Sequence, residues 1–69
     1  MEIIKVKEEY IKLGQALKAV GLVDSGVEAK EVIVNELVKV NNEIETRRGK
    51  KLYPGDIVEY NGDKIKIED

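Results

Sequence analysis

The spacing of apolar residues changes from that of a helix to that of a strand within residues 13–40, LGQALKAVGLVDSGVEAKEVIVNELVKV. The first apolar residues recur at i, i+3, i+4 and i+7, which places them on one face of a helix. They are Leu13, Ala16, Leu17 and Val20. Gly21 follows at the position where a helix end favours a residue with positive φ. The pattern predicts a short helix over residues 13–20, which needs tertiary packing to be stable.

A second helix is predicted over residues 26–35. Ser25 and Glu28, three residues apart, have the spacing of a capping box. Ala29, Val32 and Ile33 supply the buried stripe of this helix. Only a short loop joins the two predicted helices, so we expect them to pack as a pair.

The rest of the chain alternates apolar and polar residues, which is typical of strands. Predicted strands cover residues 37–40, 43–45, 57–60 and 64–67, and an amino-terminal strand over residues 3–6 joins the same sheet with an unassigned partner. Asn41-Asn42 and Asn61-Gly62 are predicted hairpin turns. Tyr53-Pro54-Gly55-Asp56 has the order of a type II turn, in which Asp56 accepts backbone hydrogen bonds.

These elements predict an α+β fold in which a short helical pair packs on one face of a small, mostly antiparallel sheet. A chain of 69 residues is too short for two independent cores, so residues 1–69 form one predicted domain. The short, charged edge at residues 43–45 discourages pairing between copies, which favours a monomer.

Composition excludes several classes of function. The chain has no cysteine and no histidine, which argues against Cys/His zinc sites and histidine-based catalytic triads. Its apolar runs are too short to span a membrane, and its first residues lack the features of a signal peptide. We therefore expect a cytoplasmic protein with no metal, no cofactor and no membrane partner.

Candidate catalytic residues are also scarce. Ser25 is the only serine and is better explained as a helix cap, and Thr46 is the only threonine and has no neighbouring base. The isolated Gly49 and Gly55 do not form a glycine-rich loop of the kind that holds nucleotide phosphates. We therefore predict a protein that is not an enzyme and takes no small-molecule substrate.

The charge of the chain is unevenly distributed. Its 12 basic and 14 acidic residues give a net charge of −2, yet one short segment is strongly basic. This segment contains Arg47, Arg48, Lys50 and Lys51, and no acid between them. Arginine binds phosphate oxygens through two parallel hydrogen bonds, and lysine adds a mobile charge. The segment is either a phosphate-binding loop or a solvated loop that keeps the protein soluble.

Four further residues extend the candidate site. Lys30 on the second helix, together with Gln15 and Lys18 on the first, could enlarge the basic surface, although Glu28 and Glu31 flank Lys30. Tyr53 lies two residues after the lysine pair and either contacts a base or sugar or closes the core under the Pro-Gly turn.

The order of several segments resembles a known family. The segments are LGQALK at 13–18, GLVDSG at 21–26, Ala29-Lys30, VKVN at 38–41 and ETRRGKKLYPGD at 45–56. Together they resemble the S-four-like RNA-binding domain, named after ribosomal small-subunit protein four, over about residues 10–60. The small stand-alone YaaA/YbcJ-like bacterial family is the most similar branch.

The resemblance implies an αL motif, in which a helical pair leads into a β-hairpin, and non-catalytic binding of structured RNA, such as ribosomal or transfer RNA or a ribosomal particle. It assigns RNA contacts to Lys30 and to the basic loop at Arg47, Arg48, Lys50 and Lys51. It implies structural roles for Asn41 and for Gly55-Asp56. This chain departs from many members of the family by having Ser25-Gly26 where they have Ser-Arg, and by its acidic second helix.

Two functional hypotheses therefore remain open. The first is a module that binds structured RNA through the basic loop and the helix face. The second is a protein-interaction adaptor whose basic loop docks an acidic partner. Binding to DNA is a third, weaker option.

Overall fold

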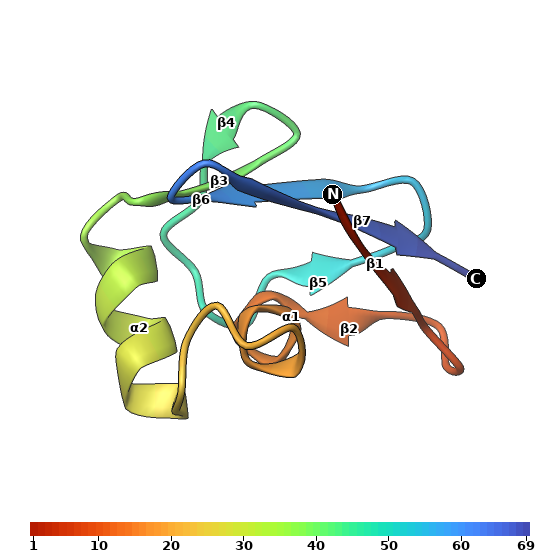
Figure 1. Ribbon diagram of the computed structural model, residues 1–69, viewed down its shortest axis with the longest axis horizontal. Helices are drawn as coiled ribbons and strands as arrows, with labels where there is room; N and C mark the ends of the chain where they lie inside the picture. Colours follow the sequence, from red (N-terminus) through yellow and green to blue (C-terminus); the bar gives the residue numbers. More distant parts are fainter.

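The computed structural model describes residues 1–69 and contains two layers. The elements are β1 (Glu2–Lys5), β2 (Ile11–Lys12), α1 (Leu13–Ala19), α2 (Gly26–Val34), β3 (Val38–Val40), β4 (Glu43–Ile44), β5 (Lys51–Leu52), β6 (Ile57–Tyr60) and β7 (Asp63–Glu68). A five-stranded sheet with the order β1-β7-β6-β3-β4 forms one layer. The helices and a two-stranded β2–β5 sheet lie on one side of it (Figure 1). The predicted α+β arrangement is confirmed.

Both helices end in the same hydrogen-bonded motif. After α1, the N–H of Gly21 donates to Lys18 O and the N–H of Leu22 donates to Leu17 O. After α2, Glu36 and Leu37 make the equivalent bonds. This is the Schellman arrangement, which requires a positive φ at the first residue beyond the cap. Gly21 has a φ of +78°, which glycine adopts without strain, whereas Glu36 has a φ of +64° despite its side chain.

The core consists only of apolar side chains, and no buried side-chain nitrogen or oxygen lacks a hydrogen-bond partner. Its members are Leu13, Ala16, Leu17, Val23, Ala29, Val32, Ile33, Val38, Val40, Leu52, Val58, Ile65 and Ile67. The predicted buried stripes of both helices are therefore confirmed, except that Val20 is only partly buried and follows α1. The predicted strand over residues 37–40 begins one residue later, at Val38. Leu37 is exposed and instead completes the hydrogen-bonded motif that follows α2.

The two predicted hairpin turns are present. Asn41 and Asn42 connect β3 to β4 with φ of +52° and +70°, and Asn61 and Gly62 connect β6 to β7 with +53° and +84°. Positive φ at both central residues is the type I′ geometry that suits the twist of a hairpin. These turns fix the registers in which Val40 faces Glu43 and Tyr60 faces Asp63.

Three pairings were not assigned from the sequence, and one of them is the antiparallel pairing of β3 with β6. β1 pairs in parallel with β7, with Glu2 opposite Ile65 and Lys5 opposite Glu68, so the first and last strands of the chain are neighbours. β2 pairs with β5, which makes Lys51 part of a strand instead of the predicted loop. Two-residue strands are too short to show an alternating pattern. Neither helix has the length and apolar run needed to cross a membrane.

Candidate nucleic-acid interface

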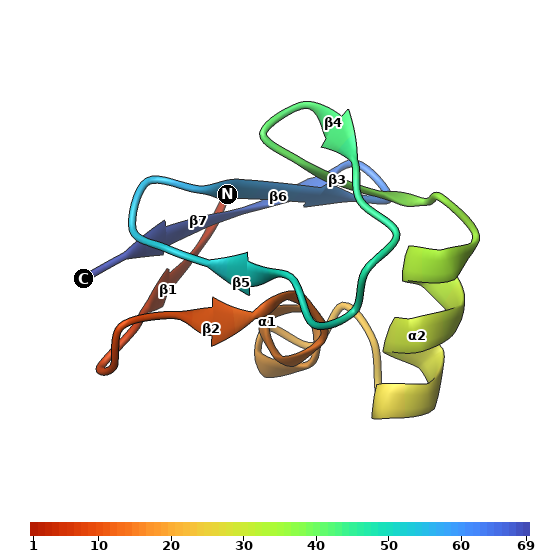
Figure 2. The ribbon, with the colours of Figure 1, turned by 180° about the vertical axis from the view of Figure 1, so that it is seen from behind.

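The basic segment runs from the end of β4 into β5, where Lys51 lies, and is fixed to the start of α1 (Figure 2). The N–H of Leu13 donates to Lys50 O at 2.9 Å, and the N–H of Gly14 donates to Arg48 O at 3.1 Å. The first N–H groups of a helix have no partner within the helix, so the basic segment satisfies two of them. Its backbone is thereby held against the helical pair.

Gly14 allows Arg48 to lie close to α1. A Cβ atom at position 14 would be 2.9 Å from Arg48 Cγ and 3.5 Å from Arg48 Cδ. Carbon atoms normally pack at about 3.5–4.0 Å, so a side chain at position 14 would displace the arginine. The contact therefore depends on glycine at this position.

Arg48 lines an open hollow of about 690 Å³ between the two helices and the basic segment, which we call the helix-pair groove. Its long polar side chains are Lys12, Gln15, Lys18 and Arg48, and its remaining lining residues are Gly14, Ala19, Gly26, Ala29 and Gly49. No carboxylate lines it. Three cations around small residues create a locally positive concave surface on a chain of net charge −2.

Lys12 is a groove residue that the sequence analysis missed. It precedes α1, and its N–H donates to Gln15 Oε1 at 3.3 Å. Lys12, Gln15 and Lys18 are spaced by three residues, and three-residue neighbours lie on one side of a helix. That spacing is the sequence signal that would have placed Lys12 beside Gln15 and Lys18.

The four basic residues of the segment do not point to one place. Arg47 faces Glu45, with Nε at 3.0 Å from Oε2 and a terminal nitrogen at 3.2 Å from Oε1. The hydrogen bonds and charge of Arg47 hold the pKa of Glu45 below its usual range, and Glu45 raises the pKa of Arg47. Together with Lys50, this pair lines a smaller hollow beside β4. The charge of Arg47 is therefore offset locally.

Lys51 and Tyr53 lie on a different side, with Tyr10. The Lys51 Nζ atom is 4.8 Å from the centroid of the Tyr10 ring, a cation–π distance. The rings of Tyr10 and Tyr53 are 6.0 Å apart at an angle of 53°. Tyr53 is exposed, so the alternative that its ring closes the core is wrong. Lys30 is exposed on α2 and is not among the groove residues.

Asn41 and Asp56 connect two turns. Asn41 Nδ2 donates to Asp56 Oδ1 at 3.0 Å, and Asn41 Oδ1 accepts from the N–H of Ile57 at 2.9 Å. Asp56 Oδ2 accepts from the N–H of Tyr53 at 2.8 Å, as the predicted turn requires. These contacts join the β3–β4 turn to the Pro-Gly turn and agree with the structural roles implied by the resemblance.

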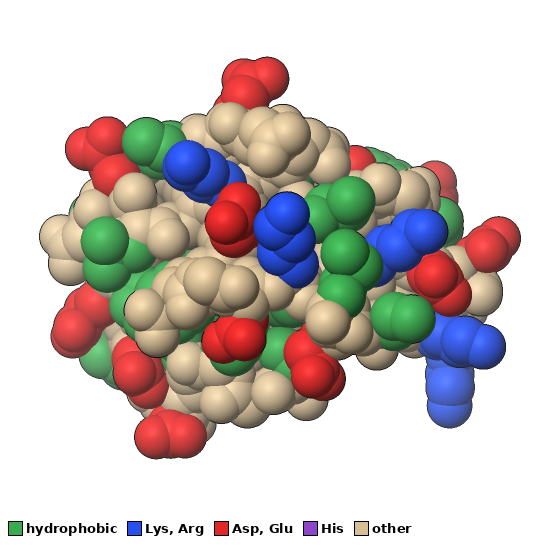
Figure 3. Space-filling view, turned by 45° about the horizontal axis from the view of Figure 1, so that its top comes forward, with side chains coloured by type: hydrophobic (Ala, Val, Ile, Leu, Met, Phe, Trp, Pro, Cys, Tyr) green, Lys and Arg blue, Asp and Glu red, His purple; other side chains and the backbone are tan.

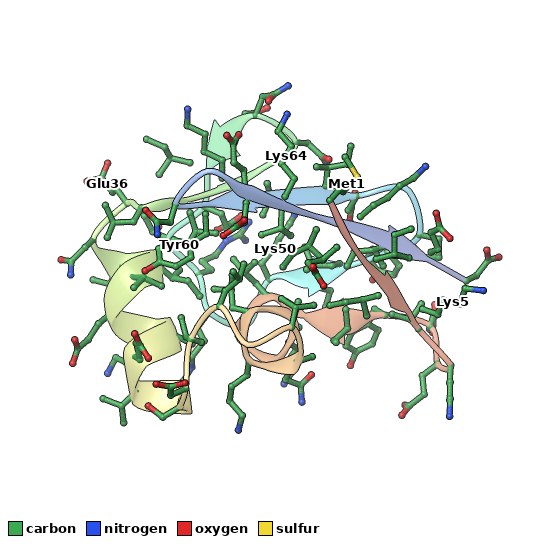
Figure 4. The ribbon with its side chains drawn as sticks, in the orientation of Figure 1. Met1, Lys5, Glu36, Lys50, Tyr60 and Lys64 are labelled. Carbon is green, nitrogen blue, oxygen red and sulfur yellow. The ribbon has the colours of Figure 1, made fainter.

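The outer face of the five-stranded sheet has mixed charge (Figure 3). Lys39 faces Glu59, which in turn faces Lys64, so opposite charges are adjacent across β3, β6 and β7. Lys64 points away from the helices (Figure 4). This face provides lysines that are remote from the helix-pair groove.

Comparisons with known proteins give the family. Residues 4–68 match the model of the S4 domain. The Bacillus subtilis (strain 168) protein RlbA, named for ribosome maturation, is 46% identical over 59 residues, which cover 86% of this chain and 83% of RlbA. The Escherichia coli (strain K12) protein YbcJ, named for RNA binding, is 33% identical over 61 residues, covering 88% of this chain and 87% of YbcJ.

The likeness extends to three dimensions. The solution structure of Escherichia coli YbcJ superposes with a TM-score of 0.76 at 30% sequence identity, covering all of this chain and 89% of YbcJ. That structure is described as containing an αL motif involved in RNA binding. Sequence match and shared topology agree, and the chain belongs to the S4 domain family.

Proposed function

We propose that this protein binds structured RNA in the helix-pair groove without catalysing a reaction. Lys12, Lys18 and Arg48 contact phosphates, and Gln15 hydrogen-bonds to a sugar or phosphate oxygen. The observation that carries the proposal is the convergence of three cations, from two separate segments, on a concave surface without a carboxylate. Such a surface attracts the RNA backbone despite the net negative charge of the chain.

The small residues of the groove suit a rigid, bulky ligand. Gly14, Ala19 and Gly26 leave the floor free of long side chains, so a phosphate-sugar backbone approaches the helices closely. Double-stranded RNA displays phosphates and 2′-hydroxyls across a wide, shallow minor groove and is recognised mostly by shape. The predicted ligand is therefore a folded RNA. The names of RlbA and YbcJ support RNA as the ligand, and that of RlbA favours ribosomal RNA or a ribosomal particle.

The remaining predicted site residues have secondary roles in this proposal. Lys50, Lys51 and Lys30 lie outside the groove and contact RNA that extends beyond it. Arg47 contributes less to RNA binding than Arg48, because its guanidinium group already forms an ion pair with Glu45.

The proposal is tested by the salt dependence of binding to an RNA hairpin. Three phosphate contacts predict a slope of log K against log salt of about −2 to −3. The double variant Lys12→Gln/Lys18→Gln should flatten that slope by about 1.4–1.8, because each lost contact removes about 0.7–0.9. The matched control Lys39→Gln/Lys64→Gln removes the same charge from the outer face of the sheet.

An equal flattening of the slope in both double variants would contradict the proposed location of the RNA, because net charge alone would then explain the flattening. Absence of RNA binding by folded wild-type protein at low salt would contradict RNA binding itself. It would favour the adaptor hypothesis, in which the same groove takes an acidic protein.

A further inference from the structure

A second hollow, of about 370 Å³, adjoins the helix-pair groove. Its lining includes Lys5, Lys7, Tyr10, Gln15 and Ala19. Gln15 and Ala19 also line the groove, so the two hollows meet across α1. An RNA that crosses α1 at Gln15 and Ala19 would therefore pass from the groove into the second hollow.

Tyr10 lines this hollow and is not part of the apolar core. The apolar core and the half-buried hydrophobic residues that pack against it include Tyr60 but not Tyr10. The Tyr10 ring is nevertheless held in place, with Lys51 Nζ at 4.8 Å and the Tyr53 ring at 6.0 Å. Lys51 lies over one face of the ring but does not line the second hollow, so the hollow adjoins a part of the ring on which a flat partner can stack.

The charges around Tyr10 favour a nucleotide as that partner. Lys5 and Lys7 line the hollow with a single acid, Glu8. Lys5 lies at the end of β1, beside the turn that leads to β2 (Figure 4). Proteins that bind single strands combine such cations, which follow the backbone, with aromatic rings on which bases stack.

We infer that the second hollow binds an unpaired nucleotide next to the helical RNA in the groove, with its base stacked on Tyr10 and its phosphates near Lys5 and Lys7. The inference rests on the proposed function and specifies its ligand. Bases within a duplex are stacked on one another, so only an unpaired base is free to reach a ring. The ligand is therefore a helix that carries a single-stranded extension.

Three hairpins with the same stem test this inference: one blunt, one with a short 5′ extension and one with a short 3′ extension. Wild-type protein should bind one extended hairpin about fivefold or more tightly than the blunt one, as a single stacked base predicts. Tyr10→Leu should remove this preference and leave affinity for the blunt hairpin unchanged. Tyr10→Phe, the matched control, keeps the ring and should keep the preference.

Equal affinity of wild-type protein for all three hairpins would overturn the inference and leave RNA binding in the groove intact. A preference that persists in folded Tyr10→Leu would also overturn it. Lys12→Gln/Lys18→Gln should weaken all three complexes, so failure of the groove is distinguishable from failure of the stacking site. If Tyr10→Leu does not fold, the Tyr10 ring resonances decide: they should shift with the preferred hairpin and not with the blunt one.

Discussion

Replacing Gly14 with alanine tests whether α1 must be free of side chains beneath Arg48. The new Cβ would lie 2.9 Å from Arg48 Cγ, which is about 0.6–1.1 Å shorter than the distance at which carbon atoms normally pack. The φ of Gly14 is not positive, so alanine fits the helix and should favour it by up to about 1 kcal/mol. Arg48 must rotate away, at a cost of about 0.5–1.5 kcal/mol if it leaves its preferred rotamer.

The helix preference of alanine and the rotamer cost of Arg48 nearly cancel in the free energy of unfolding, but RNA binding still loses Arg48. We expect Gly14→Ala to change the free energy of unfolding by less than about 1 kcal/mol. A displaced Arg48 would lose the hydrogen bonds to phosphate that we propose for it, and bonds to charged groups are worth about 1.5–3 kcal/mol. RNA affinity should therefore fall by about tenfold or more.

A double-mutant cycle with Arg48→Ala isolates the contact. In the Arg48→Ala background no long side chain is displaced, so Gly14→Ala should raise the free energy of unfolding by up to about 1 kcal/mol and leave the residual RNA affinity unchanged. Urea unfolding monitored by circular dichroism measures the free energy of unfolding. Fluorescence anisotropy with a labelled hairpin measures the RNA affinity. Equal effects of Gly14→Ala in both backgrounds, or wild-type RNA affinity of Gly14→Ala, would refute the reasoning.

Three further predictions concern stability and titration. Ser25→Ala removes the oxygen that accepts from the Glu28 N–H at 3.2 Å and should cost about 1 kcal/mol in urea unfolding, whereas Ser25→Gly should cost only a few tenths; equal costs would argue against the cap. The pKa of the Glu45 carboxyl, measured by NMR, should lie below 4.5 and return towards that value in Arg47→Gln. The stability that this pair contributes is present above pH 4.5 and is lost as the pH falls through the lowered pKa. An unchanged titration midpoint in Arg47→Gln would contradict the role of Arg47. Leu17→Ala should cost about 2–5 kcal/mol, while Leu17→Met should cost less than about 1.5, and similar costs in thermal unfolding would contradict tight packing at this fully buried site.

Local signals were enough to predict most of the elements. The helical stripes, the cap at Ser25 and the turns at Asn41-Asn42 and Asn61-Gly62 act over a few residues, and the structure contains each of them. The pairing of β1 with β7 joins the two ends of the chain, and no neighbouring residues specify it. Such long-range pairing is decided by packing of the whole core, which a pattern along one segment does not describe.

The candidate site was predicted only in part, because local signals along the sequence identify its residues but not the directions of their side chains. Gln15, Lys18 and Arg48 lie together in the helix-pair groove, and helical spacing would also have added Lys12. The divergence of Arg47 from Arg48 could not be predicted, because adjacent residues of a turn point to different sides according to backbone angles. Whether these residues touch RNA stays a prediction.

The central claim is that RNA lies in the helix-pair groove. Its most direct test is an NMR titration of isotope-labelled protein with an RNA hairpin, followed through the backbone amide signals. We predict the largest shifts at the groove amides, which include those of Gly14, Gln15, Gly26 and Gly49. Large shifts at Lys39, Glu59 and Lys64, with the groove amides unchanged, would place the RNA on the outer face of the sheet and contradict the account.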